Sequence, residues 1–139
     1  MVEITSNFPR TLTTHHDGHG LNESLNIVCD DLDPAGGGAS HGYRVLYESA
    51  PDDAGNILAC RVASIQFQHG PRNVEGSTVG VTEAVLYAIL IDRMEAFQAG
   101  PFACPENDIQ LHLLCECLAL TKERADKRAA RGVLGQNLK

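Results

Sequence analysis

Aromatic residues are scarce in this sequence: Trp is absent, and aromatic side chains make up 5% of the 139 residues. Aliphatic side chains must therefore supply most of the core. Long apolar runs are absent as well, since the longest, residues 84–91, is too short to span a bilayer. The first ten residues contain neither a basic region nor an apolar segment, which argues against a secretory signal. These absences predict a cytosolic protein with no membrane partner.

Motifs of known catalytic and metal sites are also missing. The sequence has no G-x-S-x-G or H-E-x-x-H motif. His15, His16 and His19 lie close to Asp17, but no second cluster would complete a four-ligand metal shell. The five Cys residues have no C-x-x-C spacing, and reduced, mostly buried thiols are expected. We therefore expect no catalytic residue, no metal and no cofactor.

The charge is negative overall and unevenly placed. The net charge is −7, yet the last nineteen residues hold six basic residues against Glu123 and Asp126. The first 120 residues hold five basic residues against sixteen acidic ones. An acidic body argues against a nucleic-acid polymer as partner, because such binding favours a broad positive surface. It leaves room for a small anionic ligand held near the basic end.

The length of 139 residues and the 43% hydrophobic content fit one globular domain over residues 1–139. Residues 1–22 are polar and rich in His and Gly, and predict an irregular arm. Residues 23–70 predict an antiparallel sheet, because the turn signals between their strand-like runs leave only short connections. The runs with strand character are 25–29, 43–48 and 57–68, and the last alternates in the period of a half-buried strand.

A loop is expected over 71–81 and a helical hairpin over 82–132, followed by a tail at 133–139. The first helix is predicted at about 82–98 and the second at about 105–131, with Pro105 in its first turn. The predicted apolar stripes are Leu86, Ile89, Leu90, Met94 and Phe97 in the first helix, and Ile109, Leu113, Leu114, Cys117, Leu118 and Leu120 in the second. The expected class is α+β, a small N-terminal antiparallel sheet followed by a C-terminal antiparallel helical hairpin.

Three arginines form the clearest candidate for anion binding. Arg124, Arg128 and Arg131 are four and three residues apart, so on a helix they project from one side. Because guanidinium groups bind phosphate in a bidentate manner, the three arginines predict a phosphate-binding site. The alternative interpretation is a solvated helix end whose cations are favourably placed against the helix dipole. The Gly-rich stretch GGGASH at 36–41 offers backbone amides to an anion or forms a plain hairpin loop.

The predicted helix lengths separate two groups of candidate residues. Asn107 and Arg124 are seventeen residues apart, which is about 25 Å along a helix at 1.5 Å per residue. A ligand of mononucleotide size does not reach both within one chain. Phe97 lies near Asn107 across the short connection. If one ligand contacts all of these residues together with Arg128, the arginines come from another subunit, and the protein is an oligomer.

The sequence resembles the phage-encoded sponge proteins that counter the Thoeris defence and share a helical-hairpin domain with sponges for cyclic oligonucleotides. The resemblance spans roughly residues 22 to 135. It rests on GGGASH, IQFQHGPRNVEG, GVTEAVLYAILIDRMEAFQAGPFACPEN and the helix end KERADKRAARGVLG. The LCEC segment at 114–117 and the GHGLNES segment at 18–24 depart from it.

The resemblance implies a non-enzymatic protein that binds glycocyclic ADP-ribose made by TIR enzymes and releases it uncleaved. It implies that Phe97 stacks on adenine, that Asn107 hydrogen-bonds to the ligand, and that Arg124 and Arg128 hold the diphosphate across a subunit interface. A second or accessory site, for cyclic oligonucleotides, would involve Arg72, Gly37, Gly38 and Arg131. The expected assembly is a homo-oligomer, a dimer or a hexamer, in the host bacterial cytoplasm.

Two other functions remain compatible with the sequence. One is an enzyme that degrades such a signal, which would need a general base near the phosphates. None of the six His residues is close in sequence to Arg124 or Arg128. The other is a phage protein that oligomerises through the hairpin and binds no ligand.

Overall fold

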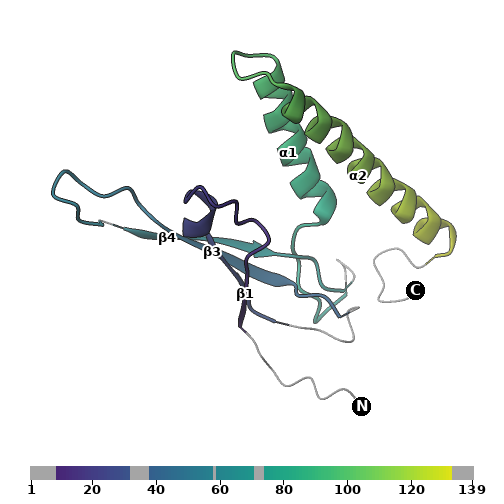
Figure 1. The fold of residues 1–139 in the computed structure, drawn as a ribbon. Helices are drawn as coiled ribbons and strands as arrows, with labels where there is room; N and C mark the ends of the chain where they lie inside the picture. The colour runs from purple at the N-terminus through teal and green to yellow at the C-terminus, as the bar shows by residue number, and fades with distance from the viewer. Residues whose placement is uncertain (1–8, 32–37, 58, 71–73, 133–139) are drawn as a thin grey trace. The chain divides into compact units, whose positions relative to one another are not determined.

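The computed structural model describes residues 9–31, 38–57, 59–70 and 74–132. The chain divides into two compact units. The sheet unit is Met1–His69 with Glu75–Gly80, and the hairpin unit is Gly70–Val74 with Val81–Lys139. The sheet unit holds antiparallel strands and the hairpin unit holds two helices, which confirms the predicted α+β class (Figure 1).

The sheet has four antiparallel strands in the order β1-β2-β3-β4. Their bounds are β1 Arg10–Leu12, β2 Asn26–Cys29, β3 Gly42–Glu48 and β4 Cys60–Gln66. The three predicted strands are confirmed, although the last is shorter than expected over 57–68. Ile57 instead forms an isolated bridge with Pro51.

The irregular arm predicted over residues 1–22 is wrong for residues 10–12. This segment is strand β1, and it pairs with β2 in the register Arg10↔Cys29, Thr11↔Val28 and Leu12↔Ile27. Three residues are too few to show a strand period, and the pairing depends on the edge that β2 offers. A 3-10 helix, η1 (Asn22–Ser24), then leads into β2.

The sheet unit buries few side chains. Among the described residues, the buried apolar side chains are Val28 and Cys29, both on β2. Strand β4 is exposed along its length except at Ile65, so the half-buried alternation predicted there is wrong. All five Cys are free, as expected, but only Cys29 is buried, because the other four lie on β4 or on and beside the exposed helices.

The segment after β4 packs tightly against it. His69 pairs with Thr78 through two backbone hydrogen bonds of 2.9 Å, and the backbone N–H of Gly80 donates to Gln68 Oε1 at 3.1 Å. A Cβ on Gly80 would collide with the backbone of Gln66 and Phe67. Only glycine therefore allows the chain to pass this close to the end of β4.

Carboxylates hold the connections of the sheet unit. Asp31 Oδ1 accepts backbone N–H groups from His41 at 2.9 Å and Gly42 at 2.8 Å. Asp52 Oδ1 accepts those of Ala54 and Asn56 at 2.9 and 2.8 Å. Glu23 accepts the backbone N–H groups of Asp17, Gly18 and Gly20. These bonds satisfy loop amides that no strand pairs.

The hairpin unit contains α1 (Glu83–Gln98) and α2 (Pro105–Ala130), which confirms both predicted helices to within a residue. Pro105 fills the first position of α2, where its missing N–H costs nothing. Glu106 and Asp108 lie in the first turn of α2, and Lys127 and Arg128 lie in its last turn. Each charge therefore matches the helix dipole.

Half-buried positions recur along both helices at alternating spacings of three and four, the pattern of a coiled-coil seam. The seam positions are Ala84, Tyr87, Ile91, Met94 and Gln98, and then Cys104, Asn107, Leu111, Leu114, Leu118, Thr121, Ala125 and Arg128. Leu86, Phe97 and Cys117 are half-buried as well, outside this spacing. No side chain of α1 or α2 is fully buried, and neither helix is long and apolar enough to cross a membrane.

The predicted apolar stripes are wrong in part, because they merge this seam with a second face. Ile89 and Leu90 of α1 are 54% and 42% exposed. Ile109, Leu113 and Leu120 of α2 are 60%, 55% and 62% exposed. Both helices carry apolar side chains on more than one face, so sequence periodicity alone did not separate the seam from the open face.

The connection between the helices is closed by Gln98. Its Nε2 donates to the Cys104 carbonyl at 3.1 Å, and its Oε1 accepts the Cys104 backbone N–H at 3.0 Å. Cys104 is the N-cap of α2 and provides no side-chain cap of its own. The two bonds therefore fix the start of α2 against the end of α1.

Acid should destabilise the sheet unit. Accepted backbone hydrogen bonds, chiefly from Gly18 to Glu23 and from Asn56 to Asp52, hold the pKa of Glu23 below 4.5 and that of Asp52 below 3.8. Burial raises the pKa of Asp31, but the N–H groups of Gly42 and His41 outweigh it and bring that pKa below 3.8 as well. The stability these groups add is present above their unfolded pKa and is lost as the pH falls through the lowered values.

Thermal unfolding followed by circular dichroism from pH 6 to pH 3 checks this expectation. Asp52→Asn should lower the midpoint at pH 6 and reduce its fall towards pH 3. Asp53→Asn is the matched control, because no described residue donates a hydrogen bond to its carboxylate. Identical pH profiles for the two variants would contradict the role given to Asp52.

Gln98→Ala should destabilise the hairpin unit by about 1–3 kcal/mol, because two partly buried hydrogen bonds are lost. Gln98→Glu keeps an acceptor for the Cys104 N–H but no donor, so its effect should be intermediate. Gln110→Ala, at an exposed position of α2, should be close to neutral. Urea unfolding followed by circular dichroism of the helices measures the stability of all three variants. Equal stability of the Gln98 and Gln110 variants would show that the two hydrogen bonds of Gln98 do not stabilise the hairpin unit.

Candidate functional site

Phe97 and Asn107 lie at the connected end of the hairpin. Phe97 is half-buried in the last turn of α1, and Asn107 is half-buried in the first turn of α2. Asn107 Nδ2 donates to the Phe102 carbonyl at 3.4 Å, which leaves its side-chain oxygen as an acceptor. The short connection therefore places an aromatic ring and an amide at the same end, as predicted.

Arg93 adds a cation that the sequence analysis did not single out. Its guanidinium carbon lies 5.4 Å from the centroid of the Phe97 ring, within the range of a cation–π interaction. The four-residue spacing within the predicted helix was the available signal. Arg93 is exposed, so its guanidinium is accessible beside the ring.

The arginines lie towards the opposite end of α2. Arg124 is exposed, and no described residue forms an ion pair or a hydrogen bond with it. Arg128 is half-buried on the seam, and Arg131 is the exposed C-cap residue. Their neighbour Lys127 is paired with Glu123 at 3.0 Å, so it is less available to a ligand. The predicted one-sided spacing is preserved because α2 continues unbroken to Ala130.

The single chain does not bring the two groups together. Asn107 and Arg124 lie on one continuous helix, which separates them by about 25 Å at 1.5 Å per residue. Helix α2 has 26 residues against 16 in α1, so it is longer by about 15 Å. The four primary candidates therefore lie in two groups, one at the connected end of the hairpin and one towards the C-terminal end of α2.

The accessory candidates are Gly37, Gly38 and Arg72, which precede the helices in the sequence, and Arg131, at the end of α2. Arg72 and Gly37 fall outside the described residues. Gly38 is exposed with φ +82°, a left-handed conformation that favours glycine, and a Cβ there would meet nothing within 4 Å. The chain at Gly38 is therefore open to approach by another group.

Buried polar atoms follow Gly38 directly. Ser40 is 6% exposed, and neither its Oγ nor His41 Nδ1 has a hydrogen-bond partner among the described residues. The His41 ring stacks on His69 with centroids 4.6 Å apart, and His41 Nδ1 lies 3.8 Å from Asp31 Oδ2. The sequence does not reveal this contact, because His41 and His69 are 28 residues apart. Unsatisfied buried atoms such as these are where a water or ligand is expected.

The His-rich stretch near the N-terminus is occupied by local hydrogen bonds. His15 Nε2 lies 2.6 Å from the Leu25 carbonyl, and Asp17 accepts the His19 backbone N–H at 3.0 Å and Asn22 Nδ2 at 2.9 Å. Across the described ranges, no group of three or more His, Cys, Asp or Glu side chains is arranged to hold a metal ion.

Comparison with known proteins gives one similarity and no family assignment. No family model matches the chain. A protein named Thoeris anti-defense 1, from Bacillus phage SBSphiJ7, is 36% identical to the chain over 82 residues, 59% of this chain and 57% of that protein. The chain thus spans a little over half the length of the phage protein that it resembles.

Proposed function

We propose that this protein is a phage anti-defence protein that counters Thoeris by sequestering glycocyclic ADP-ribose. The similarity to Thoeris anti-defense 1 carries this proposal, because that phage protein's name states an action against the defence. The two groups of candidate residues in the hairpin supply chemistry suited to such a ligand. The proposed mechanism is reversible binding without cleavage, in the host bacterial cytoplasm.

Assembly of several copies would complete the site. Apolar side chains are exposed outside the seam on both helices, Ile89 on α1 and Ile109, Leu113 and Leu120 on α2, and exposed apolar surface of this kind favours burial against further copies. Antiparallel packing of one hairpin on another would bring the arginine end of one copy to the Phe97 end of its neighbour. A dimer satisfies this geometry, and so does a hexamer built from such pairs.

Each candidate residue has a proposed role in holding the signal. The Phe97 ring stacks on the adenine, which contributes about 1–3 kcal/mol per base in comparable sites. Asn107 hydrogen-bonds to the ligand, and Arg124 and Arg128 of another copy hold its diphosphate. Water excluded at the interface would strengthen these charged contacts.

The accessory residues form a second proposed site, for cyclic oligonucleotides. Gly38 and Gly37 would let a phosphate approach the backbone, and Arg72 and Arg131 would provide charge. Two residues after Gly38, the buried Ser40 Oγ has no hydrogen-bond partner among the described residues, which supports a bound polar group there.

Incubating the protein with glycocyclic ADP-ribose, removing unbound ligand and then heating the protein tests the proposed mechanism. Recovery of intact ligand, measured by chromatography and mass spectrometry, is the expected result. Cleaved product would identify an enzyme instead. If no ligand is retained, a protein that oligomerises without a ligand becomes the better interpretation.

Arg124→Ala should weaken ligand binding about 10- to 100-fold, the loss expected for a charge-assisted hydrogen bond of about 1.5–3 kcal/mol. Lys122→Ala is the matched control, because it removes the same charge from an exposed position of α2. Titration calorimetry gives the affinities, and native mass spectrometry gives the subunit number of each variant. Equal losses in both variants would show that only the overall charge matters.

A further inference from the structure

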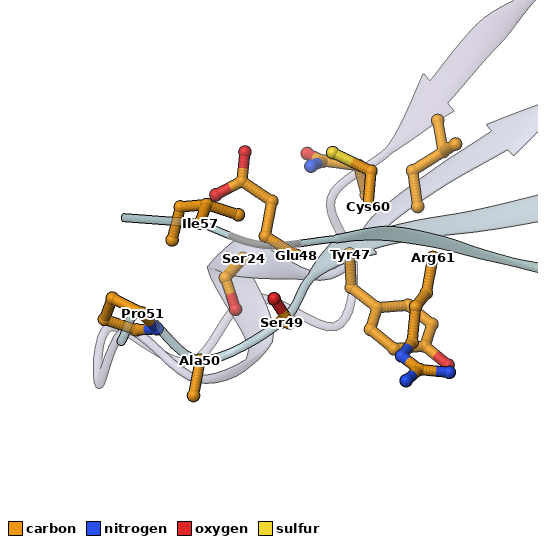
Figure 2. A pocket seen from close by; sticks show the side chains of 11 residues that line it. Ser24, Tyr47, Glu48, Ser49, Ala50, Pro51, Ile57, Cys60 and Arg61 are labelled. Atoms are coloured by element: carbon orange, nitrogen blue, oxygen red, sulfur yellow. The ribbon is translucent and has the colours of Figure 1, made fainter. Parts of the chain in front are cut away.

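A groove of about 580 Å³ lies at the end of the sheet unit where β3 leaves the sheet (Figure 2). Its walls come from η1, the end of β3, the segment that follows β3, and the start of β4. All of these elements belong to the sheet unit, so the groove is complete within it. Its volume falls within the range of about 300–1,000 Å³ that is typical of small-ligand sites.

The strand register explains why the groove exists. Strand β2 begins at Asn26, which pairs with Leu46, whereas β3 continues to Glu48. Beyond Leu46, no described strand pairs with β3 on this side. Helix η1 precedes β2, and Ser24 from η1 contributes to the wall of the groove. The space that a longer β2 would fill is therefore open.

Tyr47 and Arg61 form one side of the groove. They are direct cross-strand partners, so their side chains lie on the same face of the sheet. In Figure 2 both side chains extend to the same side of the strands. Glu48 and Cys60, the next pair, point to the opposite face. Both pairs line the groove, so Tyr47 and Arg61 contribute to it from one face and Glu48 and Cys60 from the other.

Arg61 differs from the other arginine of the same two strands. Arg44 is paired with Asp30, with 2.7 Å between Nη2 and Oδ1. No described residue forms an ion pair or a hydrogen bond with Arg61, although the first 120 residues hold sixteen acidic side chains. An uncompensated guanidinium beside an aromatic ring is suited to an anion that carries a flat ring.

A serine adds a hydrogen-bond donor to the groove. Ser49 Oγ accepts the backbone N–H of Ala59 at 3.1 Å, and its hydroxyl hydrogen has no acceptor among the described residues. Ser24 Oγ instead donates to the Leu21 carbonyl at 2.7 Å and keeps its lone pairs for a ligand. The groove thus offers a cation, a hydroxyl donor and an aromatic face.

We propose that this groove binds a small aromatic anion, whose ring lies against Tyr47 and whose acidic group pairs with Arg61. Both a nucleoside monophosphate and an aromatic carboxylate have this chemistry. The site lies in the sheet unit and uses none of the hairpin residues assigned to the cyclic signal. It therefore goes beyond the proposed function and does not depend on it.

Titration of the full-length protein with four probes, followed by ¹H–¹⁵N NMR, tests the proposal. AMP and 4-hydroxybenzoate carry both a ring and an anionic group, adenosine carries the ring alone, and inorganic phosphate carries the charge alone. We expect saturable shifts at residues 47–50 and 61 with AMP or 4-hydroxybenzoate, and at least tenfold weaker binding of adenosine and phosphate. Whichever of AMP and 4-hydroxybenzoate binds more tightly indicates whether the natural ligand is a nucleoside monophosphate or an aromatic carboxylate.

Variants of groove residues separate this site from the hairpin. Arg61→Gln should weaken binding of the preferred probe at least tenfold while leaving the rest of the spectrum unchanged. Glu48→Gln, which removes the negative charge that lines the groove, should not weaken this binding, and Arg124→Ala, in the hairpin unit, should leave it unaltered. The proposal is overturned if neither anionic probe shifts the groove resonances, if Arg61→Gln binds like the wild type, or if Arg124→Ala abolishes the binding.

Discussion

A two-helix hairpin has only one shared seam, and this limits how much apolar surface α1 and α2 can bury. Their seam follows a heptad pattern, yet no side chain on either helix is fully buried. Ile89, Leu113 and Leu120 remain more than half exposed outside that seam. The candidate residues at the two ends of α2 cannot contact one small ligand within a single chain, because one continuous helix holds them about 25 Å apart. Burial of the open face and completion of the proposed ligand site would therefore require the same event, association with further copies.

The sheet unit is stabilised in a different way. Its buried apolar side chains, among the described residues, are confined to Val28 and Cys29, so strand pairing and turn contacts must hold the rest. Asp31, Asp52 and Glu23 each accept backbone N–H groups in the connections. These carboxylates are part of the excess of acidic over basic residues in the first 120 residues. Negative charge there serves the fold locally, and it leaves basic residues such as Arg61 free of compensating partners.

The two units thus present different kinds of candidate site. The ligand site proposed for the hairpin would need a second copy, whereas the groove beside Tyr47 and Arg61 is formed within one sheet unit. Both combine an aromatic ring with a guanidinium group, since Arg93 lies over Phe97 in the hairpin. Rings and guanidinium groups bind flat anions through stacking and charge together. The overall negative charge would then disfavour long polyanions without preventing the binding of a small one.

The sequence by itself determined the element types, both helix boundaries and the spacing of Arg124, Arg128 and Arg131. These depend on local signals, such as Pro105 at the start of α2 and the Gly100-Pro101 pair that follows α1. It did not predict β1, since three residues show no period and need the edge of β2. It also merged two apolar faces of each helix, because periodicity does not say which face meets a partner. Only the tertiary structure joined His41 to His69, placed Arg61 beside Tyr47 and left Glu48 on the opposite face. Those relations depend on strand register, which long-range pairing decides.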